Sequence, residues 1–145
     1  MSDTSKLKHY AFPKANSSSF RSLVSNTDPD ISIDVGTPVA PDPDNPGQIL
    51  IGDSSAEDNS LIIGLAASAN EGNQQISIQY AGPLSQPTEW WDRLTGQSGG
   101  LTTGARYYIT NTPKVLDITA DGATFPVQVG IALSADTMMI QIVRL

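Results

Sequence analysis

The sequence contains no cysteine and one histidine, His9. Without cysteine the chain can form neither disulfide bonds nor thiolate metal sites. One histidine excludes multi-histidine metal centres, and a Ser-His-Asp triad would have to recruit His9 from the N-terminal segment. We therefore expect no cofactor, no bound metal, no catalytic residues and no enzymatic activity.

Two acidic pairs come nearest to a chemical site. Asp42 and Asp44 are spaced like the start of a calcium loop, but the glycine and glutamate that complete an EF-hand do not follow. Glu89 and Asp92 could form the carboxylate pair of a glycosidase, although two nearby carboxylates are expected by chance in a chain of this length. We interpret both pairs as ordinary surface carboxylates.

Long apolar runs are also missing. The first 12 residues lack an apolar stretch of signal-peptide length, and no later window approaches the roughly 18 apolar residues of a membrane helix. The sequence therefore predicts a soluble protein that is made in a cytoplasm and has no membrane partner.

Basic residues are absent from the middle of the chain. Residues 25–92 carry eleven acidic side chains and no lysine or arginine, whereas residues 1–24 carry four basic side chains and one acidic one. Such a middle segment would repel nucleic acid, because phosphates need basic neutralisation. The basic N-terminal segment could instead pair with the acidic body of a neighbouring copy or with another acidic surface.

Aromatic residues make up 6% of the chain, while its 145 residues include 12 glycines and 10 prolines. This composition favours a turn-rich β protein with one core. We predict an all-β fold, an antiparallel β-sandwich or barrel over residues 31–145, preceded by an extended N-terminal arm over residues 1–30.

The arm shows no sustained periodicity. It is either a flexible tail or a segment that becomes ordered on a partner, and we favour the second interpretation. Fully extended, 30 residues reach up to roughly 100 Å, far enough to contact a neighbouring subunit. The side chains predicted to dock on a partner surface or a neighbouring subunit are Lys6, Lys8, Tyr10, Phe12, Lys14 and Phe20.

Strand signals begin after the arm. Residues 31–35 alternate as a short strand, and the four prolines of residues 36–47 predict an extended linker or loop. Residues 60–67 form a continuous apolar run typical of a buried strand, although a short helix is an alternative. Residues 75–80 alternate cleanly, with Ile76, Ile78 and Tyr80 on one face, so the two runs predict a hairpin.

Residues 88–94 have the length of one helical turn or an irregular strand. Their adjacent tryptophans, Trp90 and Trp91, cannot share one face of a strand, so at least one should meet a loop, a subunit interface or solvent. Packing in a core or interface is the commoner role of such residues. Stacking on a sugar ring, with Glu89 and Asp92 accepting hydrogen bonds from its hydroxyls, is the alternative.

The last third of the chain is the easiest to interpret. Residues 106–110 and 115–119 predict paired strands, and Asp121-Gly122 predicts a two-residue turn. Residues 125–133 alternate, with small residues at Gly130 and Ala132 that would admit another chain. Residues 138–145 are apolar on both faces, as in a central strand or a strand that packs on another subunit.

Residues 88–145, about 40% of the chain, carry a spaced pattern of aromatic residues and glycines. This segment resembles a C-terminal β module of tailed-bacteriophage virion proteins, particularly capsid decoration (cement) and tail-fibre-associated proteins. The sequence departs from the family pattern at Lys114, where glycine is frequent, and at Asp136, where a hydroxyl residue is usual. The residues that carry the resemblance are Trp91, 94–96, 99–102, 104, 107–109 and 129–135.

The resemblance implies a virion structural protein, a capsid decoration protein on the outer capsid surface that binds the major capsid protein as a homotrimer. The alternatives are a receptor- or glycan-binding module of a tail fibre or spike, which would use the tryptophans and acidic loops, and a free cytoplasmic β protein. The side chains predicted to pack between subunits are Trp90, Trp91, Met138 and Met139.

Overall fold

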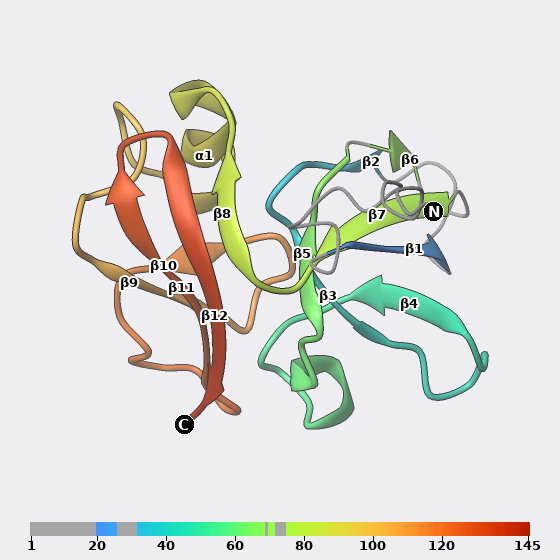
Figure 1. Cartoon of the computed structure of the whole chain (residues 1–145). Coiled ribbons are helices and arrows are strands. Elements are labelled where there is room, and N and C mark those ends of the chain that lie inside the picture. The colour runs from blue at the N-terminus through green and yellow to red at the C-terminus, as the bar shows by residue number, and fades with distance from the viewer. Residues whose placement is uncertain (1–19, 26–31, 69, 72–74) are drawn as a thin grey trace, which may run out of the picture.

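The computed structural model describes residues 20–25, 32–68, 70–71 and 75–145. These residues form β-strands together with one α-helix, α1 (Thr88–Thr95), and one short 3-10 turn, η3 (Asp58–Ser60), so the predicted all-β fold class is confirmed. The strands gather into two halves that lie side by side (Figure 1).

The first half is a small barrel. Its neighbouring strands are antiparallel except for β1 and β4, which run parallel. Since β1 pairs with both β4 and β7, the ring of strands is closed. In order around the barrel the strands are β1 (Phe20–Ser25), β4 (Gln48–Ile51), β3 (Pro38–Pro41), β5 (Gly64–Ala66) and β7 (Gln75–Gln79).

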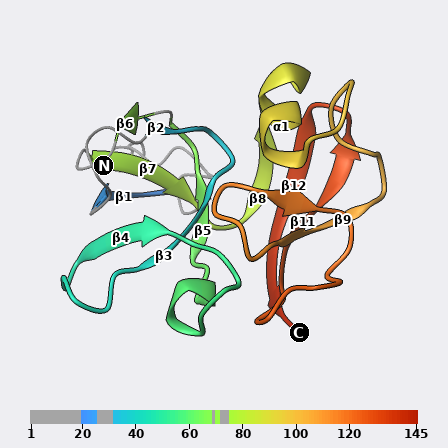
Figure 2. The same cartoon turned by 180° about the vertical axis from the view of Figure 1, so that it is seen from behind.

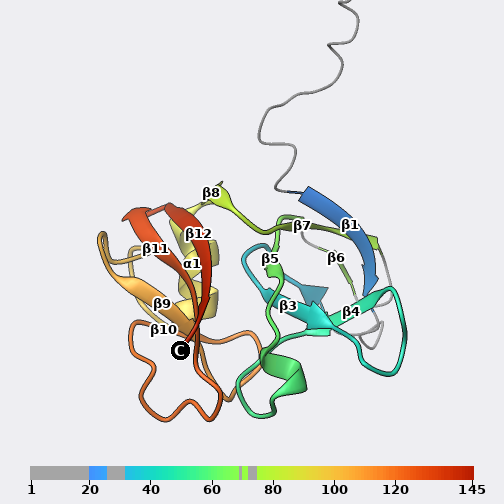
Figure 3. The same cartoon turned by 60° about the horizontal axis from the view of Figure 1, so that its bottom comes forward.

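The second half is an open antiparallel sheet, which Figure 2 shows from behind. Figure 3 shows the chain passing from β7 of the barrel into β8 at the edge of this sheet. A separate two-stranded ribbon pairs β2 (Ser32–Ile33) with β6 (Asn70–Glu71). In order across the sheet the strands are β10 (Leu116–Asp117), β9 (Arg106–Ile109), β11 (Val127–Ser134), β12 (Thr137–Arg144) and β8 (Gly82–Ser85).

Two apolar clusters fill these halves. The smaller lies in the barrel and consists of Ile33, Val39, Ile49, Ala66, Ile76 and Ile78. The larger combines one face of the five-stranded sheet with Trp91 and Leu94 of α1, and it also includes Ala40, Ile62 and Leu65 from the barrel. Because barrel side chains enter the larger cluster, the two halves share part of a core.

The hairpin predicted from residues 60–67 and 75–80 is confirmed, since β5 pairs antiparallel with β7. Ile76 and Ile78 are both 1% exposed, as their alternation predicts. Tyr80 departs from the predicted face: β7 ends at Gln79, and the Tyr80 side chain is 42% exposed.

The proline-rich residues 36–47 differ from the predicted loop, because their first half contains β3. Pro38 and Pro41 occupy the two ends of this strand, so the missing amide donors fall at the ends of the ladder. Val39 and Ala40 between them are fully buried. The second half is a turn, in which the Asp44 amide donates to Asp42 Oδ1 at 2.9 Å.

The end of the expected arm is part of the barrel. Phe20–Ser25 forms β1, whose residues pair one by one with β7, from Phe20 opposite Gln79 to Val24 opposite Gln75. The segment has no clear alternation of its own, so its assignment depends on distant partners that a local pattern does not reveal.

Gly130 does admit a close neighbour, but the neighbour is within the chain. A Cβ atom at this position would lie 2.5 Å from the Met139 carbonyl oxygen and 2.7 Å from Met138 Cγ. The predicted approach of another chain at this point is therefore wrong, because β12 already fills the space. Register shifts between Gln128 and Gly130 also break the regular alternation of β11.

β12 is a central strand, one of the two predicted alternatives, because it lies between β11 and β8. The partner strand β8 falls where the sequence indicated only a break at Gly82-Pro83. Proline is tolerated there because β8 is an edge strand.

Candidate interaction surfaces

Five of the residues predicted to dock on a partner, Lys6, Lys8, Tyr10, Phe12 and Lys14, lie outside the described residues. The sixth, Phe20, is the first residue of β1 and stands opposite Gln79.

Helix α1 positions both tryptophans. The helical alternative for this segment is right, although the helix extends over eight residues rather than one turn. Gly96 ends the helix at φ 72°, and its amide donates to the Asp92 carbonyl at 2.8 Å. Trp91 and Leu94, three residues apart, face the core on the same side of the helix.

Trp91 is fully buried within its own chain. Its indole Nε1 donates to the carbonyl oxygen of Asp136 at 2.9 Å, which ties α1 to the turn between β11 and β12. The prediction that Trp91 packs between subunits is therefore wrong, because the side chain has no surface left for a partner. Any residue at position 136 supplies this carbonyl, so the contact does not depend on the aspartate side chain.

Trp90 lies on the solvent side of α1 and is 39% exposed. The Arg93 guanidinium lies 5.6 Å from the centre of its ring, within cation-π range. Arg93 Nη1 is also 3.8 Å from Asp34 Oδ1, near the end of β2. Trp90 is therefore the tryptophan that remains available to a partner or a sugar, with one ring face already facing Arg93.

The Asp92 carboxylate holds the loop that follows α1. Its Oδ2 accepts a hydrogen bond from the Gly99 amide at 3.1 Å, and its Oδ1 accepts one from the Gly100 amide at 2.7 Å. Glu89 instead accepts from the Thr88 hydroxyl at 3.3 Å. The two carboxylates thus have separate local partners, and Asp92 acts in loop structure.

The two methionines of β12 point to opposite faces of the sheet. Met138 is fully buried in the larger core, so its predicted role between subunits is wrong for the same reason as that of Trp91. Met139 is half-buried on the other face, where it pairs with Ile131 on β11 and Pro83 on β8. Met139 remains available for the predicted role.

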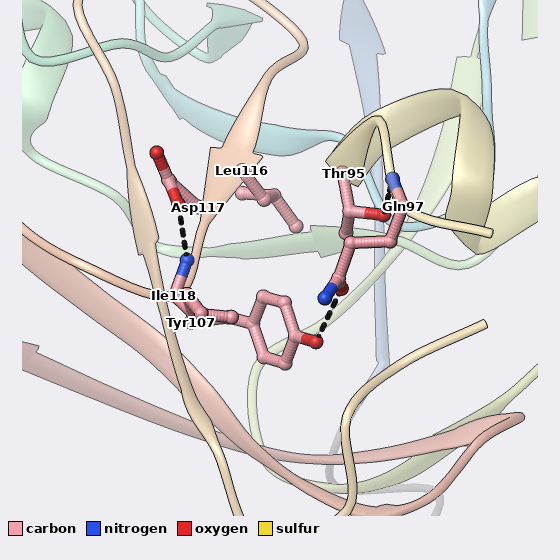
Figure 4. Close-up of a pocket in the computed structure, with 6 residues that line it drawn as sticks. All are labelled: Thr95, Gln97, Tyr107, Leu116, Asp117 and Ile118. Atoms are coloured by element: carbon pink, nitrogen blue, oxygen red, sulfur yellow. Dashed lines mark hydrogen bonds between the residues drawn. The ribbon is translucent and has the colours of Figure 1, made fainter. Parts of the chain in front are cut away.

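A cavity of about 120 Å³ opens between the end of α1 and β10. Both Tyr107 and Gln97 line it, and in Figure 4 their side chains point toward each other, with the Tyr107 hydroxyl donating to Gln97 Oε1 at 2.6 Å. The same hydroxyl accepts from the Thr102 amide at 2.8 Å. At ~30 Å³ per water molecule this space holds about four waters, well below the volume of an ordinary ligand pocket.

No group of acidic and histidine side chains suited to a metal ion occurs among the described residues. Asp42, the candidate from the sequence, is 8% exposed and accepts hydrogen bonds from the Asp44 amide and from Asn45 Nδ2. Its carboxylate therefore stabilises the turn before β4.

The Asp136 carboxylate accepts hydrogen bonds from Ser134 at 2.7 Å and from Thr137 at 3.0 Å. These bonds, that of Ser134 first, lower the pKa of Asp136 below its usual value. A lowered pKa in the folded state means that this contribution to stability is present above the unfolded pKa and is lost as the pH falls.

Four glycines between α1 and β9 have a backbone role. Gly96, Gly99, Gly100 and Gly104 all have positive φ, between 72° and 93°. Lys114, where the family pattern often has glycine, has φ 66°, the one positive value at a non-glycine position in the described chain. A lysine therefore occupies left-handed backbone in this turn.

No protein-family model matches the chain, and a comparison with curated proteins gives no significant match. No helix in the described part is both long and apolar enough to cross a membrane.

Proposed function

We propose that this protein is a bacteriophage capsid decoration (cement) protein, which binds the major capsid protein on the outer shell and stabilises the assembled capsid. The observation that carries the proposal is the resemblance of residues 88–145 to the β module of phage virion proteins. Trp91, Leu94 and Tyr107 of that pattern are buried in the core, and four of its glycines, Gly96, Gly99, Gly100 and Gly104, have positive φ. The resemblance thus rests on residues that determine the fold.

The mechanism is stabilisation by mass action. A protein that bridges assembled capsid subunits binds the assembled state and not its separated parts, so each bound copy shifts the equilibrium toward the intact shell. When one copy makes several contacts, each contact raises the effective concentration at which the others form. Interfaces that are individually modest can therefore together resist the pressure inside the capsid.

The charge distribution supports an attachment role for the N-terminal segment. Residues 1–24 carry a net charge of +3, whereas residues 25–92 carry −11. The basic segment is therefore suited to an acidic surface of a capsid protein or of a neighbouring copy, with Tyr10, Phe12 and Phe20 as apolar anchors.

The fold defines the deletion that tests this role. Residues 20–25 form β1 of the barrel, so the deletion must end at residue 19 to leave the body intact. We expect the variant that lacks residues 1–19 to bind purified capsids at least about tenfold more weakly, because it loses both the basic charges and two aromatic anchors. Binding should be measured by sedimentation with capsids, together with the melting temperature of the capsid.

A second deletion, of residues 1–25, is the control for folding, since it removes β1 and opens the barrel. Undiminished occupancy and unchanged capsid melting by the variant without residues 1–19 would contradict the role of the segment. The expected homotrimer is checked separately by the mass of the purified protein, and hundreds of copies per virion are expected for a decoration protein.

A receptor- or glycan-binding module of a tail fibre is the second candidate, and the exposed Trp90 favours it. A sugar could stack on the ring face opposite Arg93, with Glu89 beside it. This function predicts a few copies per virion and glycan binding that is lost in Trp90→Ala.

A further inference from the structure

The turn between β10 and β11 carries a reactive pair of residues, Asp121 and Gly122. They form the one Asp-Gly pair of the sequence, and no Asn-Gly pair occurs. Glycine has no Cβ atom, so the backbone nitrogen of Gly122 is not crowded by a side chain of its own. Such a nitrogen can approach the side-chain carboxyl of the preceding aspartate and attack it.

Both reacting groups are accessible in the structure. Asp121 and Gly122 are exposed. The turn is closed by a hydrogen bond from the Ala123 amide to the Ala120 carbonyl at 3.1 Å. Within the described residues, neither the Asp121 carboxylate nor the Gly122 amide makes a hydrogen bond, so no such interaction holds these two groups apart.

Gly122 also leaves the peptide unit free to turn. Its φ is 82°, and glycine adopts positive and negative φ about equally readily. A Cβ atom built at this position would meet nothing within 4 Å, so the space beside Gly122 is open. The peptide plane between Asp121 and Gly122 can therefore rotate until the nitrogen faces the side-chain carboxyl.

The other aspartates of the described chain lack this combination, because each precedes a residue that has a Cβ atom. Asp117 comes nearest, since the Ile118 amide donates to its Oδ1 at 2.7 Å, but the branched side chain of Ile118 crowds that nitrogen. The carboxylates that already accept hydrogen bonds are those of Asp42, Asp53, Asp92, Asp117 and Asp136. Asp121 is therefore the position at which sequence and structure together favour the attack.

We propose that Asp121 is a site of spontaneous isomerisation to isoaspartate. The Gly122 nitrogen attacks Asp121 Cγ and forms a new C–N bond, while the carboxyl hydroxyl leaves with the amide proton as water, which gives a succinimide ring. Water then adds to the backbone carbonyl carbon of Asp121 and breaks the original peptide C–N bond. The main chain now passes through Cβ and Cγ, the former backbone carbonyl is a free carboxylate, and the mass is unchanged.

Isomerisation would disturb a contact between the two halves of the molecule. Asn111 Nδ2 donates to the Gly122 carbonyl at 3.1 Å, and Asn111 Oδ1 accepts from the Thr124 amide at 3.0 Å. The same Oδ1 accepts from the hydroxyl of Ser54, which follows β4 of the barrel, at 2.6 Å. Because isoaspartate adds a methylene carbon to the main chain before Gly122, it displaces the Gly122 carbonyl and loosens the loop on Asn111.

This inference goes beyond the decoration function and does not depend on it, because the reaction is followed on the purified chain without capsids. The test is prolonged incubation of the full chain at neutral pH and physiological temperature, followed by peptide mapping. Electron-transfer fragmentation locates isoaspartate, and methylation by an isoaspartyl methyltransferase measures its amount. A linear peptide of residues 115–126 gives the rate of the same sequence without the fold.

We expect isoaspartate to accumulate at Asp121 in the full chain at a rate within about tenfold of that in the peptide, because an exposed turn opens at little cost in free energy. In the isomerised protein the Thr124 amide should exchange its hydrogen faster, since its bond to Asn111 is weakened. Unchanged exchange at Thr124 would overturn the expected effect on the loop.

Two variants serve as controls. Gly122→Ala should slow the reaction at least about tenfold, because the new side chain keeps the reacting atoms apart. Asp121→Glu keeps the charge and the glycine but must close a larger ring, so we expect no isomerised residue at position 121, whether or not the alanine variant alters folding. A full chain that reacts over about a hundredfold more slowly than the peptide would mean that the fold blocks the attack, and would overturn the proposal. Equal accumulation at Asp117 and Asp121 would also overturn it.

Discussion

The barrel and the five-stranded sheet are stabilised in different ways. The barrel cluster consists of aliphatic side chains, four isoleucines with Val39 and Ala66. The core of the sheet contains Trp91 and Tyr107, and each also makes a hydrogen bond that fixes a particular loop. The barrel core is therefore wholly aliphatic, whereas the larger core adds two aromatic side chains with defined hydrogen-bond partners to its aliphatic ones.

The halves also differ in charge. The acidic residues of the segment 25–92 lie mainly in barrel sequence, whereas residues 93–145 have four basic and three acidic side chains. A nearly neutral sheet joined to an acidic barrel gives the molecule two kinds of surface.

The largest expected effect comes from Trp91→Ala. Removing a fully buried indole leaves a cavity and an unpaired Asp136 carbonyl, so we expect a loss of about 3 to 5 kcal/mol in the free energy of unfolding. Trp90→Ala is the matched control, expected to cost no more than about 1 kcal/mol because it removes an exposed cation-π contact. Urea unfolding followed by circular dichroism measures the free energy of unfolding of both variants. Equal losses in the two variants would contradict the expected difference between a buried and an exposed tryptophan.

Two glycines, one in each half, make a matched pair for the next test. A Cβ at Gly64 of β5 would lie 2.6 Å from the Gln79 carbonyl oxygen, and a Cβ at Gly130 of β11 would lie 2.5 Å from that of Met139. Because a backbone atom blocks each site, either alanine forces strands apart, and we expect each to cost about 1 to 3 kcal/mol.

Since the halves share part of a core, both alanine variants should unfold in one transition of Trp fluorescence, although the tryptophans lie in the sheet half. Ser98→Ala, at an exposed loop position, is the control with no expected change. A barrel variant that unfolds in two separated steps would show that the shared core does not couple the halves.

The sheet half was the easier part to predict from sequence. The turn at Asp121-Gly122 forms, with the Ala123 amide donating to the Ala120 carbonyl, and β9 pairs with β10 as expected. Turn residues and alternation are local signals, so they can be recognised in the sequence without knowledge of distant strand partners. The closure of the barrel by β1 and β3 depends on pairing with strands that are distant in the sequence. In addition, Pro38 and Pro41 led to the prediction of a linker or loop where β3 lies.

The candidate surfaces were harder to predict, because a side chain's face depends on register. The alternation of residues 125–133 placed Val127 and Leu133 on one face, yet Val127 is buried and Leu133 is half-exposed. The register shifts along β11 account for the difference, and no residue type marks them in the sequence. For the same reason Met138 and Met139 could not be told apart until their partners on β11 were known.

The smallest expected effect is a gain in stability at Lys114. A side chain at φ 66° costs about 1 kcal/mol, whereas glycine adopts this conformation freely but loses about 0.5 kcal/mol through the greater entropy of its unfolded chain. Lys114→Gly should therefore stabilise the protein by about 0.5 kcal/mol, measured as a shift in the urea midpoint.

Lys114→Ala separates the effect of backbone strain on stability from the effect of the side-chain contacts, since it removes the lysine contacts but keeps the strained φ. We expect no gain from alanine and an intermediate gain from Lys114→Asn, because asparagine tolerates the left-handed region better than other non-glycine residues. A loss of stability in Lys114→Gly, with alanine neutral, would mean that backbone strain is not what distinguishes this position. The order glycine, asparagine, alanine would instead show that the left-handed backbone at position 114 sets the stability of this turn.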